Sequence, residues 1–525
     1  MRILILSIHE ETGDTVNPNA GIYRLQHYLE KNGIACDLCE VGLEDDAAVL
    51  RNTADGMYDI IGVSHTYAFL EKELPRLIPF REAASGTGCL WITGGLAPSR
   101  LPELWLEIGF DVVVLGFGEF PLLALAQKGA QASGDWAQVD FGSIDGIAWR
   151  DASGKNQLSP ARPLSEEDFR LLNYSLPKEM GIPDQWMKFI SHAGLKPEEA
   201  NRNTRFHTVP VFTSQKCPNR CGYCSSVDFL KNIYGRDCAV RSLNTDDICD
   251  LLISYYQRYG TRFYFFTDDD LPTPKRFALE LCEKINEHKR AGRLPEDLCL
   301  YCQSRVLDFI NLRTGLPDHQ LFKAMSSAGF KRANFGIETF SKRLLNTAMM
   351  NKKHYDYDIA WNLLTTAQTY GLEALANFMI MVPEATKEEI AFTIRCLLDL
   401  QDINGIAVMG MFIVPYPGAA AFDDPRYPTH NETFTSPLNG ALYIKKQYFL
   451  PHDPEIHDAL LYYMHEGVRV EIDKIKDMYG QDINIRDGRL LNMIKCYVVA
   501  KKLKLDDLVP RLESGIHNRA LKISA

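Results

Sequence analysis

Residues 216–225 read KCPNRCGYCS and place three thiols, Cys217, Cys221 and Cys224, within a span of eight positions. Thiolates bind soft metals such as iron, and cysteine is the usual protein ligand of iron–sulfur clusters. The proline and the glycine between these cysteines allow the sharp backbone turns that would aim three sulfur atoms at one centre. A closed structural zinc site normally needs four protein ligands, and only three are local here. The stretch therefore indicates an iron–sulfur site more than a closed zinc site.

The chain after this stretch alternates apolar runs with helical patterns. The six predicted strands are HTVPVFTS from His207, RFYFFTD from Arg262, CLYCQSR from Cys299, RANFGIE from Arg332, LANFMIMV from Leu375 and IAVMGMFIV from Ile406. Helical patterns at residues 245–259, 274–288 and 356–370 separate strands of this series. Six strand–helix units indicate a partial (β/α)6 barrel with its chemistry at the carboxyl-terminal rim. The cysteine stretch follows the first strand and is therefore expected at that rim.

The first third of the chain alternates in the same way and predicts a second α/β unit. Its five strands are RILILSI from Arg2, ACDLCEV from Ala35, DIIGVS from Asp59, CLWIT from Cys89 and DVVVLG from Asp111. Helical patterns at residues 22–32, 71–84 and 102–108 lie between them. Continuous β-branched runs separated by helices indicate a Rossmann-like parallel sheet that is buried on both faces.

Glycines follow the later strands of this sheet, at the place where the ligand crevice of an open α/β sheet lies. Gly94 and Gly95 follow the fourth strand, and GFGE spans Gly116 to Glu119 after the fifth. The same glycines would also suit tight turns that bind nothing. The residues alone leave both interpretations open.

At 525 residues the chain is too long for one hydrophobic core, so we expect several domains. A hairpin pattern, GIAWRDASGKNQLS, starts at Gly146, and a polar connector follows it. Helical patterns at 458–479 and 489–502 indicate a helical C-terminal cap, and three of its tyrosines either line it or pack in its core: Tyr443, Tyr448 and Tyr462. The predicted division is a Rossmann-like domain at 1–135, a hairpin and connector at 136–205, the barrel at 206–430 and the helical cap at 431–525.

Charge and hydropathy narrow the class of protein. The net charge of -11 argues against a surface that tracks phosphates, so nucleic acid is not an expected partner. No stretch reaches the roughly 18 to 20 apolar residues that a bilayer span requires. The start, MRILILSIHEETGD, becomes acidic too soon for a secretory signal, so we expect a cytoplasmic protein. Thirteen cysteines in such a chain favour reduced thiols and a metal site over a disulfide framework.

The cysteine spacing, C-x3-C-x-aromatic-C with Tyr223 as the aromatic residue, closely resembles the signature of the radical S-adenosylmethionine (SAM) enzymes. The resemblance implies that Cys217, Cys221 and Cys224 hold three irons of a four-iron, four-sulfur ([4Fe-4S]) cluster and serve catalysis through it. The fourth iron would then chelate the amino and carboxylate groups of SAM. In that family, reduction cleaves the sulfonium to a 5′-deoxyadenosyl radical.

Later segments resemble other motifs of the same family. Gly336, Ile337 and Glu338 match its Gly-Ile-Glu-Ser segment on the fourth strand, with Thr339 in place of the serine. Three further stretches resemble its second-strand end, its third-strand segment and its sixth-strand element: FTDDDL from Phe266, CQSR from Cys302 and PYPG from Pro415. The cofactor-binding residues that the resemblance implies are Tyr223, Gln303, Ser304, Arg305, Glu338, Pro415 and Gly418.

An open sheet, a hairpin and a radical SAM barrel in this order resemble the cobalamin-binding branch of the superfamily, which includes the class B radical methyltransferases. In that branch, a serine after the third strand and paired glycines after the fourth accept the nucleotide tail of cobalamin, and a Gly-x-Gly-Glu turn follows the fifth strand. The residues implied here are Ser64, Gly94, Gly95, Gly116 and Glu119. The Asp-x-His-x-x-Gly motif is not intact, since SIHEETG offers His9 but has Ser7 in place of the aspartate. We therefore expect cobalamin to bind without a histidine ligand, or to have been lost.

The resemblance implies a methyltransferase that acts on an unactivated carbon of a small or amphiphilic biosynthetic intermediate. Such an enzyme needs an external electron donor such as flavodoxin or ferredoxin. The alternative is a radical SAM cyclase or ring-rearranging enzyme that uses cobalamin or has lost it. A non-catalytic metal sensor and a sulfur-inserting methylthiotransferase also stay open, although the latter family carries three further cluster cysteines in its first domain.

The other cysteines predict buried small hydrophobic residues instead of a second metal site. Cys36 and Cys39, like Cys299 and Cys302, form C-x-x-C inside predicted strands. Residues three apart in a strand point to opposite faces, so neither pair converges on one metal. The same interpretation holds for Cys238, Cys249, Cys282, Cys396 and Cys496.

Overall fold

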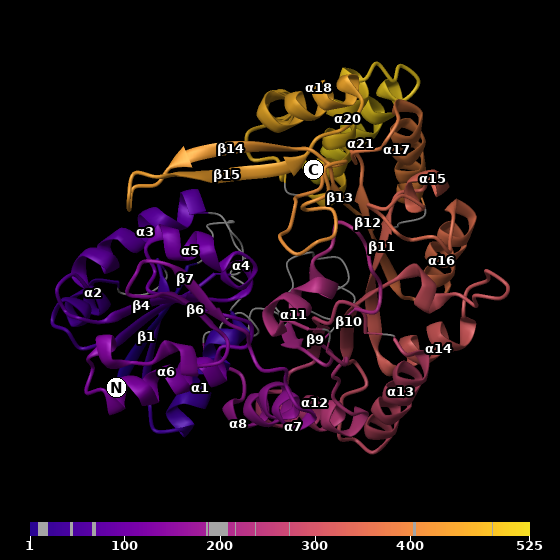
Figure 1. The fold of residues 1–525 in the computed structure, drawn as a ribbon. Coiled ribbons are helices and arrows are strands. Elements are labelled where there is room, and N and C mark those ends of the chain that lie inside the picture. The colour runs from indigo at the N-terminus through magenta and orange to yellow at the C-terminus, as the bar shows by residue number, and fades with distance from the viewer. Residues whose placement is uncertain are drawn as a thin grey trace. The chain divides into compact units, whose positions relative to one another are not determined.

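A computed structural model gives the fold of the chain (Figure 1). It describes residues 1–8, 19–42, 46–65, 70–184, 187, 208–215, 217–236, 238–271, 273–402, 406–485 and 487–524. The backbone divides into two compact units. Unit 1 comprises Met1–His192, Ser225–Leu243 and Asn431–Gln447, and unit 2 comprises Ala193–Cys224, Asn244–His430 and Tyr448–Ala525. Each unit draws on separate stretches of the chain, and the four-part division expected from the sequence stays a prediction.

A seven-stranded sheet forms the centre of unit 1, in the order β2-β1-β3-β4-β5-β6-β7. The strands are β1 (Arg2–Ile8), β2 (Ala35–Val41), β3 (Ile60–Ser64), β4 (Leu90–Gly94), β5 (Val112–Val114), β6 (Ile147–Arg150) and β7 (Asn156–Ser159). The first five strands pair in parallel, and the hairpin β6–β7 joins antiparallel to β5. The predicted Rossmann-like sheet is confirmed, and the predicted hairpin extends it by two strands.

Helices of unit 1 flank this sheet, and several of them bury apolar side chains against its strands. They are α1 (Ala20–Lys31), α2 (Asp46–Ala54), α3 (Leu70–Ala83), α4 (Leu96–Arg100), α5 (Pro102–Ile108), α6 (Glu119–Gln131), α7 (Glu166–Arg170), α8 (Leu176–Met180) and α11 (Ser226–Tyr234). Asn19 caps α1, and its side chain accepts from the Gly21 amide. The core over one face of the sheet joins Leu4 and Val63 to Trp105, which is 1% exposed. The predicted connector at 136–205 is therefore partly helical, since α7 and α8 lie in it.

Unit 2 is built on six parallel strands in the order β13-β12-β11-β10-β9-β8. The strands are β8 (Val209–Val211), β9 (Phe263–Phe266), β10 (Cys299–Ser304), β11 (Phe330–Glu338), β12 (Glu373–Met379) and β13 (Ile406–Gly410). Every neighbouring pair in this sheet is parallel. Strands that follow one another in sequence are also neighbours in space, as the predicted partial (β/α)6 barrel requires. The barrel prediction is confirmed.

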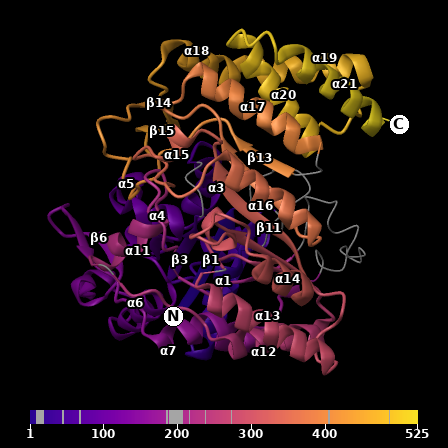
Figure 2. The same ribbon diagram turned by 90° about the vertical axis from the view of Figure 1, so that its right-hand side faces the viewer.

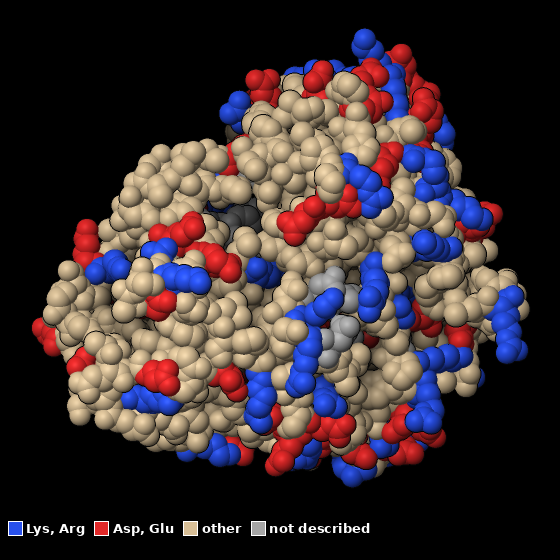
Figure 3. All heavy atoms as spheres, in the orientation of Figure 1, with Lys and Arg blue, Asp and Glu red and all other residues tan. Residues whose placement is uncertain are grey.

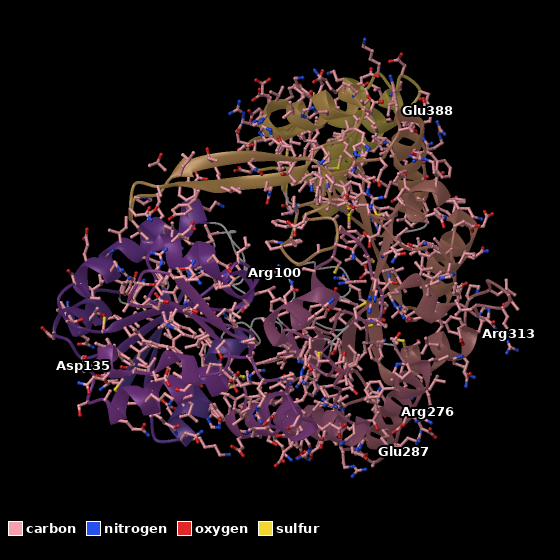
Figure 4. The ribbon with its side chains drawn as sticks, in the orientation of Figure 1. Arg100, Asp135, Arg276, Glu287, Arg313 and Glu388 are labelled. Atoms are coloured by element: carbon pink, nitrogen blue, oxygen red, sulfur yellow. The ribbon has the colours of Figure 1, made fainter. Side chains whose placement is uncertain are left out.

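Helices cover the outer side of this sheet (Figure 2). They are α12 (Thr245–Tyr259), α13 (Lys275–Arg290), α14 (His319–Ala328), α15 (Lys342–Leu345), α16 (Tyr357–Thr369) and α17 (Lys387–Asp402). Arg276 and Glu287 on α13 and Glu388 on α17 are exposed and point away from the sheet (Figure 4). On the molecular face drawn in Figure 3, acidic and basic side chains are interspersed.

The C-terminal helices are α18 (Pro454–Tyr462), α19 (Val468–Tyr479), α20 (Gly488–Lys502) and α21 (Val509–Ser524). A π-helical turn at Tyr463–Gly467 joins α18 to α19, where the sequence predicts one helix. Tyr443 and Tyr448, which are 6% and 0% exposed, pack in the cores of units 1 and 2 respectively. No helix among the described residues is long and apolar enough to cross a membrane.

A β-hairpin precedes these helices, and the sequence analysis did not anticipate it. Its strands are β14 (Thr429–Thr435) and β15 (Leu442–Phe449). Residues along β14 alternate between half-buried and exposed, so the strand lacks the apolar run that identifies a core strand. The start of the expected helical region at 431–525 is therefore extended instead of helical.

Candidate cofactor-binding sites

The cysteine loop follows β8 and packs against residues 347–352 of the same unit, which we call the strap. A Cβ atom on Gly222 would lie 2.3 Å from the carbonyl oxygen of Ala348, so this approach requires glycine. The Tyr223 amide donates to the Met349 carbonyl at 3.3 Å. The strap therefore fixes the backbone between the second and third cysteines.

Each of the three thiols is half-buried. Burial raises the pKa of the Cys217 thiol to about 12 and also raises the pKa of Cys221, whose sulfur accepts from the Asn219 amide at 3.0 Å. In the described part of the chain, no group of three or more His, Cys, Asp or Glu side chains is arranged to hold a metal ion. The donors suit an iron–sulfur cluster, whose binding would gather the sulfur atoms and release their protons. The assignment of Cys217, Cys221 and Cys224 as ligands stays a prediction.

Glu338 ends β11 with a φ of 64°, in the left-handed region. For a non-glycine residue this backbone conformation costs about 1–3 kcal/mol of free energy, and residues in such conformations occur mainly at functional sites. The Tyr223 hydroxyl donates to Glu338 Oε1 at 2.9 Å, and Lys352 Nζ donates to the same oxygen at 2.6 Å. Lys352 also donates to the Gly336 carbonyl at 2.7 Å. The structure thus brings together Tyr223 and Glu338, as predicted, and adds a lysine.

Lys352 is a buried cation that the sequence analysis missed. Its exposed fraction is 7%, whereas the neighbouring Lys353 is exposed. Burial by itself lowers the pKa of the Lys352 ammonium. The Glu338 carboxylate, the Tyr355 hydroxyl and the Cys221 sulfur have the opposite effect and hold that pKa above its ordinary value. No pattern in the run NKKH separates the buried lysine from the exposed one, because only the tertiary packing does.

Arg305 follows β10, and two acidic side chains hold its guanidinium. It donates to Asp308 Oδ1 at 2.5 Å, and its Nε lies 2.8 Å from Asp270 Oδ2. Burial and then the nearby Asp308 charge raise the pKa of the Asp270 carboxyl. The predicted residues Gln303 and Ser304 are the last two of β10, directly before this arginine. The family resemblance implies that Arg305 reaches a cofactor. Its two acidic partners fix the position of its guanidinium charge.

Asp268 lies in the FTDDDL stretch, and the sequence resemblance assigns no role to this residue. It is 0% exposed and follows β9. Its carboxylate accepts from the Thr213 amide at 2.9 Å, from the Thr213 hydroxyl at 3.0 Å and from the Ser214 hydroxyl at 2.8 Å. Burial raises its pKa to about 6 against these hydrogen bonds. Asp268 therefore ties the end of β9 to the start of the cysteine loop.

The PYPG segment, residues 415–418, follows β13 and turns toward the cysteine loop. Gly418 has a φ of 84°, which favours glycine. The amide of Ala421, three residues further on, donates to the Gly222 carbonyl at 2.9 Å. The structure thus places the segment that holds Pro415 and Gly418 next to the loop, and their contact with adenine stays a prediction.

Unit 1 holds a separate cavity of about 290 Å³ at the carboxyl ends of its parallel strands. Its lining includes all five residues predicted for cobalamin: Ser64, Gly94, Gly95, Gly116 and Glu119. Gly95 has a φ of 105°, and a Cβ atom there would lie 2.5 Å from the His65 carbonyl oxygen. A larger residue could not take this position without moving the backbone. The structure gathers the predicted set, and its contact with cobalamin stays a prediction. His9 lies outside the described residues.

Polar side chains that the sequence analysis missed also line this cavity. Arg24 pairs with Glu119 at 2.5 Å and donates to Asn173 at 3.2 Å. The side-chain amide of Asn19 donates to the Ser64 hydroxyl at 3.1 Å. Glu119 is 2% exposed, and its Oε2 atom accepts no hydrogen bond within the described structure. A buried carboxylate oxygen is stabilised by a hydrogen bond from a donor group, so the cavity suits a ligand with N–H or O–H groups.

The nine cysteines predicted to be buried are confirmed as such with one exception, Cys238; Cys89 is not part of that prediction. Those in the cores are Cys36, Cys39, Cys249, Cys282, Cys299, Cys302, Cys396 and Cys496. Cys89 and Cys238 are half-buried. Burial raises the pKa of both Cys36 and Cys302 to about 12, which keeps them protonated and unreactive.

Comparison with known proteins identifies the class. Residues 211–397 match the radical SAM superfamily. This range contains the cysteine loop, Arg305 and Glu338, whereas the PYPG segment at 415–418 lies beyond it. The resemblance inferred from the sequence is confirmed, and residues 211–397 are a radical SAM domain.

Two relatives in sequence are methyltransferases by name. An uncharacterized methyltransferase of Pyrococcus horikoshii is 26% identical over 338 residues, which cover 63% of this chain and 62% of the relative. The cytidylyl-2-hydroxyethylphosphonate methyltransferase of Streptomyces wedmorensis is 23% identical over 356 residues, which cover 65% of this chain and 61% of the relative. The match thus spans less than two thirds of the length of either relative.

Solved structures define the fold more narrowly. The radical SAM methyltransferase TsrM of Kitasatospora setae, with tryptophan and a SAM analogue bound, has a TM-score of 0.62 at 16% identity and covers 88% of each chain. The cobalamin-dependent radical SAM enzyme OxsB, with aqua-cobalamin bound, has a TM-score of 0.60 at 14% identity and covers 95% of this chain and 71% of that chain. The chain therefore has the fold of the cobalamin-dependent radical SAM enzymes.

Proposed function

We propose that this chain is a cobalamin-dependent radical SAM methyltransferase that acts on an unactivated carbon of a biosynthetic intermediate. One observation carries the proposal: the aromatic residue of the cysteine signature, Tyr223, bonds the carboxylate of Glu338 at the end of β11. Two motifs that are 115 positions apart in sequence therefore meet at the carboxyl-terminal edge of one sheet. The names of the sequence relatives support methyl transfer.

The residues of unit 2 would hold the cluster and SAM. When bound, the [4Fe-4S] cluster supplies the electron that cleaves the sulfonium of SAM, and cobalamin supplies the methyl group. Cys217, Cys221 and Cys224 would ligate the cluster as thiolates. Glu338, which Tyr223 holds by a hydrogen bond, would accept a hydrogen bond from the amino group of SAM. These side chains bind and orient groups, and placement is the main contribution of a protein to cofactor chemistry.

The cavity of unit 1 would hold the nucleotide tail of cobalamin. Its glycines allow a ligand to approach the backbone closely, and Ser64 offers a hydroxyl that Asn19 already orients. The Glu119 Oε2 atom, which accepts no hydrogen bond from the described residues, would accept one from an amide or hydroxyl of the ligand. Cobalamin here is proposed to bind without a protein imidazole. An external electron donor such as flavodoxin or ferredoxin and a cytoplasmic location complete the proposal.

The test is anaerobic reconstitution of the full chain with iron, sulfide and cobalamin. With reductant and SAM, the protein should release 5′-deoxyadenosine, and a substrate should gain the mass of one methylene. Cys221→Ala should abolish both the cluster absorbance and SAM cleavage, whereas Cys238→Ala, which removes a half-buried thiol outside the loop, should retain both. SAM cleavage with no gain in product mass would favour the cyclase or ring-rearranging alternative. No cleavage at all would refute radical SAM chemistry.

A further inference from the structure

Lys352 is a buried positive charge next to the cysteine loop, and no motif of the radical SAM signature accounts for it. It belongs to the strap, and the Lys352 amide donates to the Leu345 carbonyl at 2.8 Å. Its side chain is 7% exposed. A buried ammonium is costly unless it is paired and hydrogen-bonded, and here Glu338 and a carbonyl oxygen satisfy it. The position of the charge is therefore set by the fold.

The strap holds this charge against the cysteine loop through several contacts. The Asn351 side-chain amide donates to the Arg220 carbonyl at 2.6 Å, directly before Cys221. Gly222 packs on the strap backbone, as described above. A cavity of about 260 Å³ is lined by Lys352 together with Asn219 and Arg220 of the loop. Lys352 is thus held on a strap that contacts the cysteine loop directly.

The electrostatics of this arrangement point toward the sulfur ligands. Lys352 and the Cys221 sulfur interact, since the lysine charge favours the thiolate and the sulfur favours the ammonium. Glu338 has the opposite sign and shares the same surroundings. A cluster held by three thiolates carries net negative charge, and reduction makes it more negative. Nearby charge is one of the factors that set the potential of an iron–sulfur cluster.

We propose that Lys352 is a charge-compensating residue that makes the cluster easier to reduce, while Glu338 opposes it. The inference rests on the proposed function, because it requires a cluster on Cys217, Cys221 and Cys224. It adds a role for a residue outside the signature motifs: the strap carries a fixed positive charge to the cysteine loop. The positive charge of Lys352 raises the reduction potential of the cluster and the negative charge of Glu338 lowers it, so the net effect of the ion pair is the difference between the two.

The test is a redox titration of the reconstituted full chain, followed by electron paramagnetic resonance without SAM. Lys352→Met keeps an unbranched side chain of similar length and removes the charge. It should make cluster reduction about tenfold less favourable, which is about 59 mV for one electron. Glu338→Gln should shift the potential by a similar amount in the opposite direction. Lys353→Met removes the adjacent exposed charge, which water and salt screen, and should change the equilibrium less than threefold.

Opposite shifts from the two members of the ion pair are a result that a purely structural role would not give. If Lys352→Met binds a full cluster with a potential within threefold of wild type, the proposal is overturned. If Lys352→Met does not retain a cluster, the reduction potential of Glu338→Gln tests the proposal instead. A potential in Glu338→Gln that equals or lies below that of the wild type overturns the proposal as well. A wild-type chain that binds no cluster would instead refute the proposed function.

Discussion

Gly222→Ala is the substitution whose effect the structure defines most sharply. The added methyl carbon would lie 2.3 Å from the Ala348 carbonyl oxygen, and carbon and oxygen atoms do not approach so closely without a bond between them. The obstacle is strap backbone, so either the loop or the strap must move by about 1 Å. Overpacking of this kind costs about 1–3 kcal/mol. The cost falls on the loop that presents the three thiols.

We expect Gly222→Ala to lower the free energy of unfolding of the chain by about 1–3 kcal/mol and to reduce cluster occupancy. The assay is the iron and sulfide content after anaerobic reconstitution, together with the thermal midpoint of the cluster-free protein. Gly488→Ala is the matched control, because a Cβ atom at that exposed helix start meets nothing within 4 Å. The control should bind a full cluster and melt at or slightly above the wild-type temperature. Full occupancy and an unchanged midpoint in Gly222→Ala would show that the strap does not shape the loop.

Two further predictions concern other parts of the site. Gly95→Ala should weaken cobalamin binding to the apoprotein about tenfold or more in an absorbance titration, because its Cβ would lie 2.5 Å from the His65 carbonyl oxygen. The control is Gly154→Ala, whose φ is also positive but whose Cβ meets nothing within 4 Å, and it should bind cobalamin as the wild type does. Equal affinities of the wild type and both variants would argue against this cavity as the cobalamin site. Burial raises the pKa of Asp268 from 3.8 to about 6, so the folded chain binds the proton of this carboxyl more tightly than the unfolded chain does. This proton therefore stabilises the folded state fully below pH 3.8, and the stabilisation is lost as the pH rises through about 6. The thermal midpoint of Asp268→Asn should therefore fall less than that of wild type between about pH 4 and about pH 7, and parallel curves would contradict the assignment.

The strands and glycines could be predicted because their signals are local. Apolar runs identify all thirteen strands of the two large sheets except the short polar β7, which its hairpin partner reveals. Glycines at strand ends are informative since positive φ or close backbone contact restricts those positions to glycine, as at Gly95. The cysteine spacing is likewise readable because all three residues lie on one loop.

The rest of the site depends on contacts between distant segments. Lys352 resembles the exposed Lys353 in sequence, and only the packing of the strap on β11 buries it. Arg24 and Asn19 belong to an amphipathic helix start, and their place in the cavity follows from the sheet order and not from α1 itself. The acidic partners of Arg305 come from two different segments, which no single motif contains. Such pairings become visible only once the strands are in register.

The most direct measurement of the central claim is the electron paramagnetic resonance spectrum of the reduced, reconstituted protein before and after addition of SAM. Three cysteine ligands leave one iron of the cluster free, so the signal of a chain with about four irons should change when SAM binds that iron. Cys221→Ala should lack the signal altogether. Zinc in place of iron, or a cluster signal that SAM leaves unchanged, would contradict the account.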